Sequence, residues 1–410
     1  MKVLLVGSGG REHALAWKLS QSAECAELHA APGNPGIASL GHCHPVHAED
    51  QEGLLALARE LGIELVVVGP EAPLVRGLAD ELRHSGIATL GPGREAARIE
   101  GSKSFAKEVM LRTGVPTARR LAEARAPCVV KADGLAAGKG VYVCRTQAEA
   151  DAAVTEAAGR GGGILLEELL EGEEVSLLAL CDGASAVALP PAQDFKRALD
   201  GDRGPNTGGM GAFSPVPGLD ASRIDELVST IHDVVLAELA ARGAPFLGVL
   251  FAGLMQTTEG PRVLEFNARF GDPEAQTLLP RLEGDLLPVL WRAATGELGA
   301  DELEVSTGAA VTVVLASERY PRAGDSGTPI EGIPQAEATG ALVFHAGTAL
   351  RQGDLVTNGG RILGVTGRGA TLAEARTRAY AGVEQISFAG VRCRGDIALE
   401  AAGAEHDVDG

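Results

Sequence analysis

The chain has 410 residues, which is enough for two or three ordinary domains and a sizeable buried core. Hydrophobic residues make up 45% and charged residues 22%, a globular composition that excludes a disordered or fibrous protein. The formal net charge of −19 argues against nucleic acid or an anionic membrane as the main partner, because binding to either requires a basic surface.

The sequence does not have the usual marks of a membrane or secreted protein. Its longest apolar runs, such as 65–68 and 309–316, are far shorter than the roughly 18 residues of a membrane helix. The first apolar run reaches glycines too early for a signal peptide. The six cysteines are scattered without a Cys-x-x-Cys pair, so we expect reduced thiols and a cytoplasmic location. The histidines of the loop 41–47 are too close in sequence to reach one tetrahedral metal ion together.

Short apolar runs alternate with helical segments over the first hundred residues. Strands are predicted at 3–7, 64–69 and 88–90, and helices at 11–20, 52–60 and 76–85. This alternation predicts an open parallel sheet with helices on both faces. We expect this N-terminal α/β substrate-binding domain to span residues 1–101.

The pattern changes at Ser102, which we expect to cap a helix running to about residue 112. Further strands are predicted at 128–131, 141–144, 164–168, 175–181, 248–256 and 262–267, and helices at 147–158 and 222–242. The last hundred residues alternate strands and turns, with one helix at 372–382 and a frayed tail from 405. We therefore expect a second domain at 102–300, with a mobile lid at about 127–182, and a small, mainly-β (α+β) C-terminal domain at 301–410.

A glycine loop, Gly7-Ser8-Gly9-Gly10-Arg11-Glu12, follows the first strand and opens a helix. Its sixth position is Glu12, whereas a dinucleotide fingerprint needs Gly or Ala there for close packing beside a pyrophosphate. NAD binding is therefore not expected. A glycine turn at a helix N-terminus can still present backbone N–H groups to a single anion, or it can be a tight structural turn only.

A second loop, at 131–140, places Lys131 on a strand and Lys139 among glycines and alanines. Small residues allow the backbone to close over phosphates, and ammonium groups neutralise them. Neither of the two residues directly after Lys139 carries a hydroxyl group, so the loop is not a P-loop. A glycine-rich loop between two strands is typical of a lid over a nucleotide.

The strand at 262–267 carries a third group of polar residues. Glu265 and Asn267 are two residues apart and share a face, and Arg269 joins them if the strand continues. A carboxylate with an amide oxygen suits a hard cation such as Mg²⁺. Taken alone this pattern also fits an ordinary polar strand face, so the metal hypothesis depends on the lysine loop as well.

Six blocks, in order along nearly the whole chain, resemble the phosphoribosylamine–glycine ligase family of the ATP-grasp superfamily. The blocks are Gly-Gly-Arg-Glu-His (9–13), Gly-Pro-Glu-Ala-Pro-Leu (69–74), Lys-Ala-Asp-Gly-Leu-Ala-Ala-Gly-Lys-Gly (131–140), Gly-Pro-Asn-Thr-Gly-Gly-Met-Gly-Ala (204–212), Glu-Phe-Asn-Ala-Arg-Phe-Gly-Asp-Pro-Glu (265–274) and Phe-His-Ala-Gly-Thr (344–348). The resemblance implies an ATP-grasp fold. It also implies ATP-dependent ligation of glycine to 5-phosphoribosylamine through glycyl phosphate, a step of purine biosynthesis.

The same resemblance implies roles for individual residues. ATP would be bound by Lys103, Lys131, Lys139, Glu167, Glu168, Leu169, Leu170, Glu174, Arg197 and Asn206. The substrates would lie near Gly9, Gly10, Asn34, Glu71, Arg269 and Asp272. Glu265 and Asn267 would bind Mg²⁺, with Mn²⁺ as an alternative, while Arg269 and Lys139 would act in catalysis. No protein partner is implied.

Two positions depart from the family pattern: Phe195 stands where His is usual, and Ala275 where Thr is common. Neither change removes an expected metal ligand. Another ATP-grasp ligase or carboxylase would share the nucleotide site and differ in the acceptor pocket. A phosphosugar-binding or nicotinamide-binding protein without ligase activity is the alternative from a different class.

Overall fold

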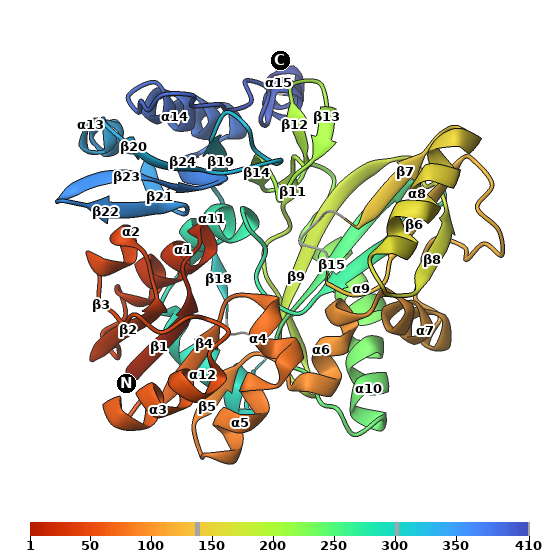
Figure 1. The fold of residues 1–410 in the computed structure, drawn as a ribbon, viewed down its shortest axis with the longest axis horizontal. Coiled ribbons are helices and arrows are strands. Elements are labelled where there is room, and N and C mark those ends of the chain that lie inside the picture. The colour runs from red at the N-terminus through yellow and green to blue at the C-terminus, as the bar shows by residue number, and fades with distance from the viewer. Residues whose placement is uncertain (136–139, 300–302, 409–410) are drawn as a thin grey trace.

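A computed structural model describes residues 1–135, 140–299 and 303–408, which form three lobes around a central region (Figure 1). Lys139 and the middle of the lysine loop lie outside the described residues. Within the described part of the chain, none of the helices is long and apolar enough to cross a membrane.

The N-terminal lobe is built on a parallel five-stranded sheet in the order β3-β2-β1-β4-β5. Its strands are β1 (Lys2–Gly7), β2 (Glu27–Pro32), β3 (His42–Cys43), β4 (Leu65–Val68) and β5 (Ala88–Leu90). Its helices are α1 (Gly10–Leu19), α2 (Pro35–Ala38), α3 (Gln51–Leu61), α4 (Glu71–Arg76), α5 (Leu78–His84) and α6 (Arg94–Gly101). The predicted α/β class is confirmed, and the continuous burial of β1 and β4 is typical of a parallel sheet covered on both faces.

Two details of this lobe differ from the sequence prediction. The helix predicted over 76–85 is divided into α4 and α5 at Gly77, whose φ of 95° belongs to the left-handed region and ends a helix. The strand β2 was not predicted, although its residues are mostly buried beside β1.

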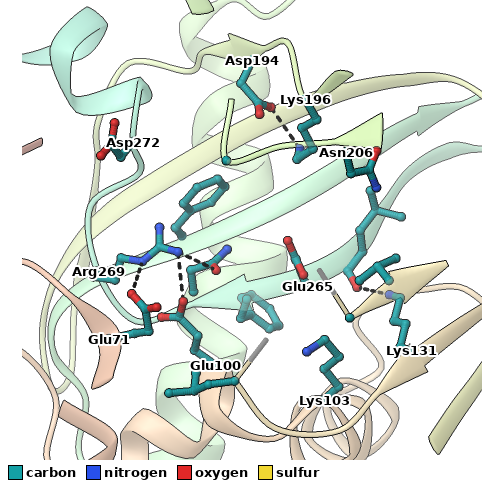
Figure 2. A pocket seen from close by; sticks show the side chains of 18 of the residues that line it. Glu71, Glu100, Lys103, Lys131, Asp194, Lys196, Asn206, Glu265, Arg269 and Asp272 are labelled. Carbon is teal, nitrogen blue, oxygen red and sulfur yellow. Dashed lines mark hydrogen bonds and ion pairs between the residues drawn. The ribbon is translucent and has the colours of Figure 1, made fainter. Parts of the chain in front are cut away.

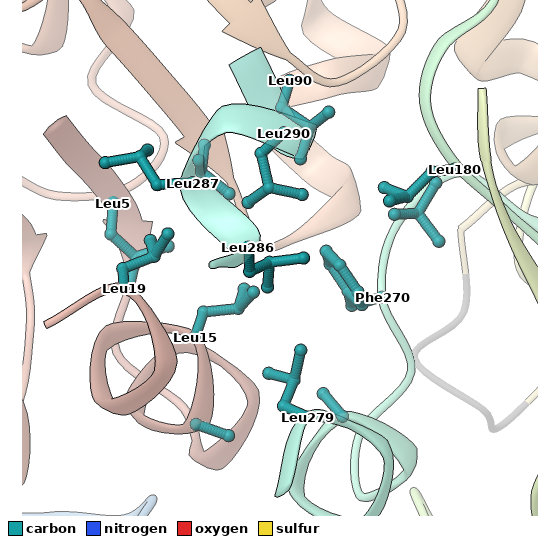
Figure 3. Packing of buried hydrophobic residues seen from close by; sticks show 14 of the residues in the cluster. Leu5, Leu15, Leu19, Leu90, Leu180, Phe270, Leu279, Leu286, Leu287 and Leu290 are labelled. Carbon is teal, nitrogen blue, oxygen red and sulfur yellow. The ribbon is translucent and has the colours of Figure 1, made fainter. Parts of the chain in front are cut away.

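A single apolar core joins the N-terminal lobe to the central sheet. Helix α12 (Leu286–Thr295) contributes Leu286, Leu287 and Leu290, which pack between leucines of α1 and β1 and residues of the central region (Figure 3). Leu287 and Leu290 are fully buried. Because this core is shared, α12 fixes the N-terminal lobe against the sheet that carries Glu265 and Asn267.

The central region contains an antiparallel sheet in the order β10-β9-β15-β16. Its strands are β9 (Glu173–Asp182), β10 (Ala186–Ala188), β15 (Leu247–Thr257) and β16 (Gly260–Asn267). Helices α7 (Lys103–Thr113), α9 (Ala221–Leu227) and α10 (Asp233–Ala241) pack with it, and a π-helical turn (Val228–His232) interrupts the helix predicted over 222–242. Ser102 caps α7 as predicted, since its hydroxyl accepts a hydrogen bond from the Phe105 N–H.

Lys131, at the start of the lysine loop, lies in a separate small sheet in the order β7-β6-β8, with one helix against it (Figure 1). The elements are β6 (Cys128–Ala132), β7 (Val141–Cys144), α8 (Gln147–Gly159) and β8 (Ile164–Glu168), in agreement with the predicted ranges. The helix begins at a capping box formed by Thr146 and Glu149.

The C-terminal lobe combines two sheets, in the orders β11-β14-β19-β24-β21 and β20-β23-β22. The strands are β11 (Gln193–Asp194), β14 (Gly211–Ser214), β19 (Ala309–Ala316), β20 (Asp325–Pro329), β21 (Leu342–His345), β22 (Thr348–Arg351), β23 (Asp354–Gly359) and β24 (Arg361–Gly369). Its helices are α13 (Ile333–Ala338), α14 (Leu372–Val383) and α15 (Leu399–Val408). The tail expected to fray from 405 is therefore helical to Val408.

Short elements connect the lobes. They are the hairpin β12 (Arg197–Leu199) and β13 (Arg203–Asn206), α11 (Glu274–Leu278), a 3₁₀ turn (Leu279–Arg281), β17 (Leu282–Glu283) and β18 (Glu304–Val305). Strands β11 and β14 come from the central segment but pair within the C-terminal sheet. The C-terminal lobe is thus bound to the central region by strand pairing as well as by packing.

The buried imidazole of His232 predicts a pH-dependent term in stability. Burial lowers its pKa to about 4, while its Nε2 lies 3.2 Å from the Leu250 carbonyl oxygen. Because the unfolded imidazole keeps a pKa near 6.5, the unfolded state alone binds the proton between pH 6.5 and 4, and stability falls with acidification by about 1.4 kcal/mol per pH unit. We expect His232→Gln, which keeps an amide near Leu250, to lose less stability between pH 7 and pH 5 than the unchanged protein. Urea unfolding at both pH values measures the difference, and identical pH dependence would contradict the assignment.

Candidate active site

A cavity of about 500 Å³ lies where the central sheet faces the other lobes and the small lysine-bearing sheet. Its lining includes nine of the residues singled out in the sequence: Glu71, Lys103, Lys131, Glu167, Asn206, Glu265, Asn267, Arg269 and Asp272. Figure 2 shows lysines at one end of this cavity and the Arg269 cluster with its acidic partners at the other. Residues as far apart in sequence as Glu71 and Asp272 therefore share one site.

At the lysine end, a buried carboxylate is held between two ammonium groups. Lys131 Nζ lies 2.6 Å from one oxygen of Glu167, and Lys107 Nζ contacts the other. Lys131 also donates to the Leu264 carbonyl at 2.8 Å, and Lys107 donates to the Ala118 carbonyl at 2.7 Å. Glu167 was expected to bind ATP, but its carboxylate is buried and engaged by the two lysines. Lys107 was not singled out in the sequence.

The carbonyl that accepts from Lys131 is exposed by a β-bulge. Gly253 pairs with Glu265 and Leu254 pairs with Val263, so Leu264 has no partner on β15. Bulges of this kind commonly adjust the direction of side chains beside active sites. Here the irregularity lies directly before Glu265.

Glu265 and Asn267 line the cavity from the end of β16, as their spacing predicts. In the described part of the chain, the Glu265 carboxylate makes no hydrogen bond or ion pair. Figure 2 shows it between the Arg269 cluster and Lys131. Lys103 donates to the Gly134 carbonyl at 3.0 Å, and burial lowers the pKa of its ammonium group. Arg269 lies beyond the end of β16, so it does not continue the strand.

Arg269 forms the centre of the acidic end of the cavity. Its Nη2 lies 3.0 Å from Glu100 and its Nε lies 3.5 Å from Glu71 (Figure 2). Burial disfavours the charged guanidinium, but the carboxylates of Glu100 and Glu71 outweigh this effect and raise the pKa of Arg269. Burial also raises the pKa of Glu100. Any substrate carboxylate that binds Arg269 must therefore compete with these two acids.

A third charged group lies near the hairpin. Lys196 Nζ is 2.5 Å from Glu174 and 3.0 Å from Asp194. Burial lowers the pKa of Lys196, but the carboxylates of Asp194 and Glu174 outweigh this effect and raise the pKa well above its usual value. Burial, followed by the nearby Asp194, raises the pKa of Glu274 to about 7. Glu174, which was expected to bind ATP, is thus paired with Lys196.

Several expected nucleotide residues do not line the cavity. Glu168, Leu169 and Leu170 lie at and after the end of β8, where the Glu168 carboxylate accepts a hydrogen bond from the Arg119 N–H at 2.8 Å. Arg197 donates to the Gly204 carbonyl at 2.9 Å within the hairpin. The expected role of Lys139 falls outside the described residues.

A second cavity, of about 680 Å³, lies between the N-terminal and C-terminal lobes. It is lined by Gly9 and Asn34 on one side and by residues 346–350 on the other, and it shares Asp272, Gly360 and Arg361 with the first cavity. Arg361 Nη2 lies 3.1 Å from the Asp272 carboxylate. The two cavities therefore meet at one ion pair.

The glycine loop does not leave its Gly9 N–H group free for an anion. The Gly9 N–H donates to the Glu12 carboxylate at 2.6 Å, so a side chain of the protein already occupies this donor. Asn34 donates to the Ser8 and His345 carbonyls, each at 2.9 Å, and its amide oxygen caps α2. Gly10 lies against Gln276, and a Cβ added there would be 2.3 Å from the Gln276 amide nitrogen.

Sequence reasoning gave no site role to Glu12, Glu100, Lys107, Asp194, Lys196, Glu274 or Arg361. Glu274 and Glu12 lie inside quoted family blocks, and Asp194 and Lys196 flank the noted Phe195, so a signal was present for these four. Lys107 and Glu100 lie on ordinary helical segments, and no local pattern separates them from surface charges.

The histidines of the loop 41–47 do not gather into a metal site. His44 Nε2 lies 3.0 Å from His29 Nδ1, a hydrogen-bond distance, and His29 Nε2 lies 3.1 Å from Glu27. Among the described residues, no group of three His, Cys, Asp or Glu side chains is arranged to hold an ion.

The antiparallel central sheet, the small lysine-bearing sheet and the cavity between them define an ATP-grasp ligase. Family models for the phosphoribosylglycinamide synthetase N domain, ATP-grasp (A) domain and C domain match residues 1–100, 101–275 and 310–400. The chain belongs to the phosphoribosylglycinamide synthetase family.

Relatives and solved structures agree with this membership. The chain is 50% identical to a phosphoribosylamine–glycine ligase of Agrobacterium fabrum, over 99% of this chain and 100% of the relative. It is 52% identical to one of Streptomyces coelicolor, over 98% and 100%. The crystal structure of a phosphoribosylamine–glycine ligase from Thermotoga maritima is similar at a TM-score of 0.84 with 34% identity, covering 97% of this chain and 100% of that one. The biotin carboxylase domain of a Hydrogenobacter thermophilus 2-oxoglutarate carboxylase, solved with MgADP and bicarbonate, shares the fold at a TM-score of 0.71 with 19% identity, covering 96% and 91%.

The buried Lys107–Glu167 contact predicts a large effect on stability. Lys107→Met leaves a buried carboxylate with one partner fewer and two oxygen acceptors without a donor, so we expect a loss of about 3 kcal/mol in the free energy of unfolding. The double variant Lys107→Met/Glu167→Gln removes both charges and should recover part of that loss. Arg112→Met, which breaks the exposed pair with Glu238, is the matched control and should cost less than about 1 kcal/mol. Urea unfolding measures all three, and additive losses would contradict a coupled cluster.

Proposed function

We propose that this chain catalyses the ATP-dependent ligation of glycine to 5-phosphoribosylamine, giving glycinamide ribonucleotide, ADP and phosphate. The observation that carries this proposal is the polarised cavity, with lysines at one end and the Arg269 cluster at the other, joined at Asp272 to a second cavity. The names of the full-length relatives support the particular substrates. A cytoplasmic location and the absence of a required protein partner are proposed on the same basis.

The chemistry explains why ATP is needed. A carboxylate is a poor acyl donor, because attack by an amine would have to expel oxide. Transfer of the γ-phosphoryl group to the glycine carboxylate gives glycyl phosphate and ADP. The amine of 5-phosphoribosylamine then attacks the acyl carbon, and inorganic phosphate leaves. Catalysis then depends on positioning and charge neutralisation, and no nucleophilic side chain is required.

The residues at the lysine end fit the nucleotide. Lys103 and Lys131 would neutralise phosphate oxygens, and Asn206 would reach them from the hairpin. The free Glu265 carboxylate and the Asn267 amide oxygen are hard oxygen donors and would hold Mg²⁺. When bound, this ion would offset negative charge on the transferred phosphoryl group. Mn²⁺, Lys139 and the backbone after β8 remain further proposals for this end.

At the other end, Arg269 would orient the glycine carboxylate after exchanging one of its acidic partners for the substrate. The second cavity would hold 5-phosphoribosylamine, with its amine directed past Asp272 toward the acyl phosphate. Gly9 and Asn34 would shape the wall of this second cavity, and Gly10 would act from behind it through Gln276. Glu71 would act from the first cavity, where it pairs with Arg269. The small lysine-bearing sheet, within the proposed lid at 127–182, would close over ATP and exclude water from the acyl phosphate.

Phosphate release with each substrate omitted in turn tests this function. We expect release to require Mg-ATP, glycine and freshly generated 5-phosphoribosylamine together, and bicarbonate should not replace glycine. A second test is the variant Glu265→Gln. It removes one charge from the proposed metal site, and we expect it to lower turnover by at least about 100-fold relative to the unchanged protein. Release that depends on bicarbonate instead of glycine would assign the chain to an ATP-grasp carboxylase.

Gly10→Val tests the placement of the acceptor. The added side chain would collide with Gln276, whose amide donates to Asp272 at 2.7 Å, and would displace the ion pair where the cavities meet. We expect the Michaelis constant for 5-phosphoribosylamine to rise by about tenfold or more, equivalent to about 1.4 kcal/mol, while Mg-ATP affinity is retained. The control is Gly403→Val, because an added Cβ there meets no other atom within 4 Å. A loss of ATP affinity in a folded Gly10→Val variant would contradict the division between the two cavities.

A further inference from the structure

The hairpin formed by β12 and β13 carries Asn206 to the cavity but has little apolar support of its own. Residues 199–205 are exposed, and Ala198 is the one buried residue between 197 and 206. A two-stranded hairpin of this size is marginally stable by itself in water. Its position over the site must therefore come from contacts with the rest of the chain.

Those contacts come from a segment almost 200 residues further along the sequence, beside α15 (Figure 1). The guanidinium of Arg394 is 1% exposed, and its Nη1 donates to the Asp202 carboxylate at 2.7 Å and to the Arg197 carbonyl at 3.1 Å. Its Nε and Nη2 each donate to Asp396 at 2.7 Å. One buried cation therefore holds strand β12 and the turn of the hairpin to the C-terminal segment.

Two backbone bonds complete the contact. The Gly201 N–H donates to the Asp396 carboxylate at 2.8 Å, and the Gly395 N–H donates to Asp200 at 2.9 Å. Asp202 adopts a φ of 50°, a left-handed conformation that aspartate tolerates better than most residues. The turn of the hairpin is thus fixed by several charged hydrogen bonds at once.

Phe195, which stands where the family usually has His, belongs to the same group. Its ring centroid lies 4.8 Å from the Arg394 guanidinium carbon and 6.1 Å from the Phe213 ring. An aromatic face against a guanidinium is a favourable cation–π arrangement. Phe195 also lies between Asp194 and Lys196, which line the cavity.

A direct path leads from this anchor to the cavity. Arg197 pairs with Asn206 across the hairpin, and the Thr207 N–H donates to the Lys196 carbonyl at 2.7 Å. Asn206, Thr207 and Lys196 all line the cavity. A shift of the hairpin would therefore displace residues that line the cavity where the nucleotide phosphates are proposed to bind.

We propose that Arg394 is a positioning residue for nucleotide binding, which acts by holding the 197–206 hairpin over the phosphates while Phe195 supports its guanidinium. This inference rests on the proposed function only in that ATP is the ligand. Arg394 itself touches neither cavity, so its effect is transmitted through Asp202 and the backbone of Arg197.

Direct binding of Mg-ATP, measured by calorimetry, separates this inference from ligase activity. We expect Arg394→Met to weaken Mg-ATP binding by about tenfold and to raise hydrogen exchange at 197–206 in the nucleotide-free protein. Arg394→Lys, which keeps a charge near Asp202, should recover part of the affinity. Arg392→Met is the control, because Arg392 lies two residues away and donates to the Glu318 carbonyl, away from the hairpin.

Asp202→Asn removes one charge at the exposed end of the contact and keeps the test valid if Arg394→Met does not fold. We expect weaker Mg-ATP binding in this variant, with an unchanged thermal midpoint of unfolding. In the double variant with Arg394→Lys, the loss of binding free energy should be smaller than the sum of the losses in the two single variants. Unchanged Mg-ATP affinity in both Arg394→Lys and Asp202→Asn would overturn the proposal. If the unchanged protein binds Mg-ATP but forms no glycinamide ribonucleotide, the proposed function fails while this inference can still be tested.

Discussion

The shape of the cavity depends on the buried guanidinium of Arg269, because its acceptors come from three separate parts of the chain. These acceptors are Glu71 at the start of α4, Glu100 in the last turn of α6 and Asn267 at the end of β16. Removing a charged group from water costs several kcal/mol, and only complementary charge and hydrogen bonds offset that cost. These three elements therefore cannot separate without exposing or isolating a buried charge.

At the opposite end of the cavity, the buried charge is negative and its partners are positive. There, two lysines surround the single carboxylate of Glu167, whereas two carboxylates surround the single guanidinium of Arg269. The lysine end thus has an excess of positive charge and suits phosphate groups, and the Arg269 end has an excess of negative charge. Glu265, whose carboxylate makes no ion pair with a described side chain, lies between these two ends of the cavity. In the proposed reaction, the polarity of the cavity would give a direction to phosphoryl transfer before any substrate binds.

The sequence predicted the elements and the family, but it predicted individual roles less completely. The ranges of β6, β7, α8 and β8 follow from local hydrophobic patterns, and the spacing of Glu265 and Asn267 places both in the cavity. The partners of Glu167, Asn34 and Gly9 could not be predicted, because they depend on contacts across the fold or on a side chain turning back on its own loop. The residue-by-residue ATP and substrate assignments therefore remain predictions. Phe195 shows the same limit, since its partner Arg394 lies 199 positions away in a segment with no motif.

The C-terminal lobe is part of the site even though few of its residues line the first cavity. Arg361 donates to the Asp272 and Gly208 carbonyls, each at 2.6 Å, and so ties two site loops to β24. Behind them, the buried hydroxyls of Thr277, Thr312 and Thr366 form a chain with distances of 2.7 and 2.8 Å, which ends on the Gln276 carbonyl. Buried hydroxyls that are fully paired restrict the elements that carry them, because each lost bond would leave a polar group without water. The segment from Glu265 to Thr277 is thus held by the C-terminal lobe through these bonds and by the N-terminal lobe through Arg269, so both flanking lobes contribute to the geometry of the ATP-grasp region.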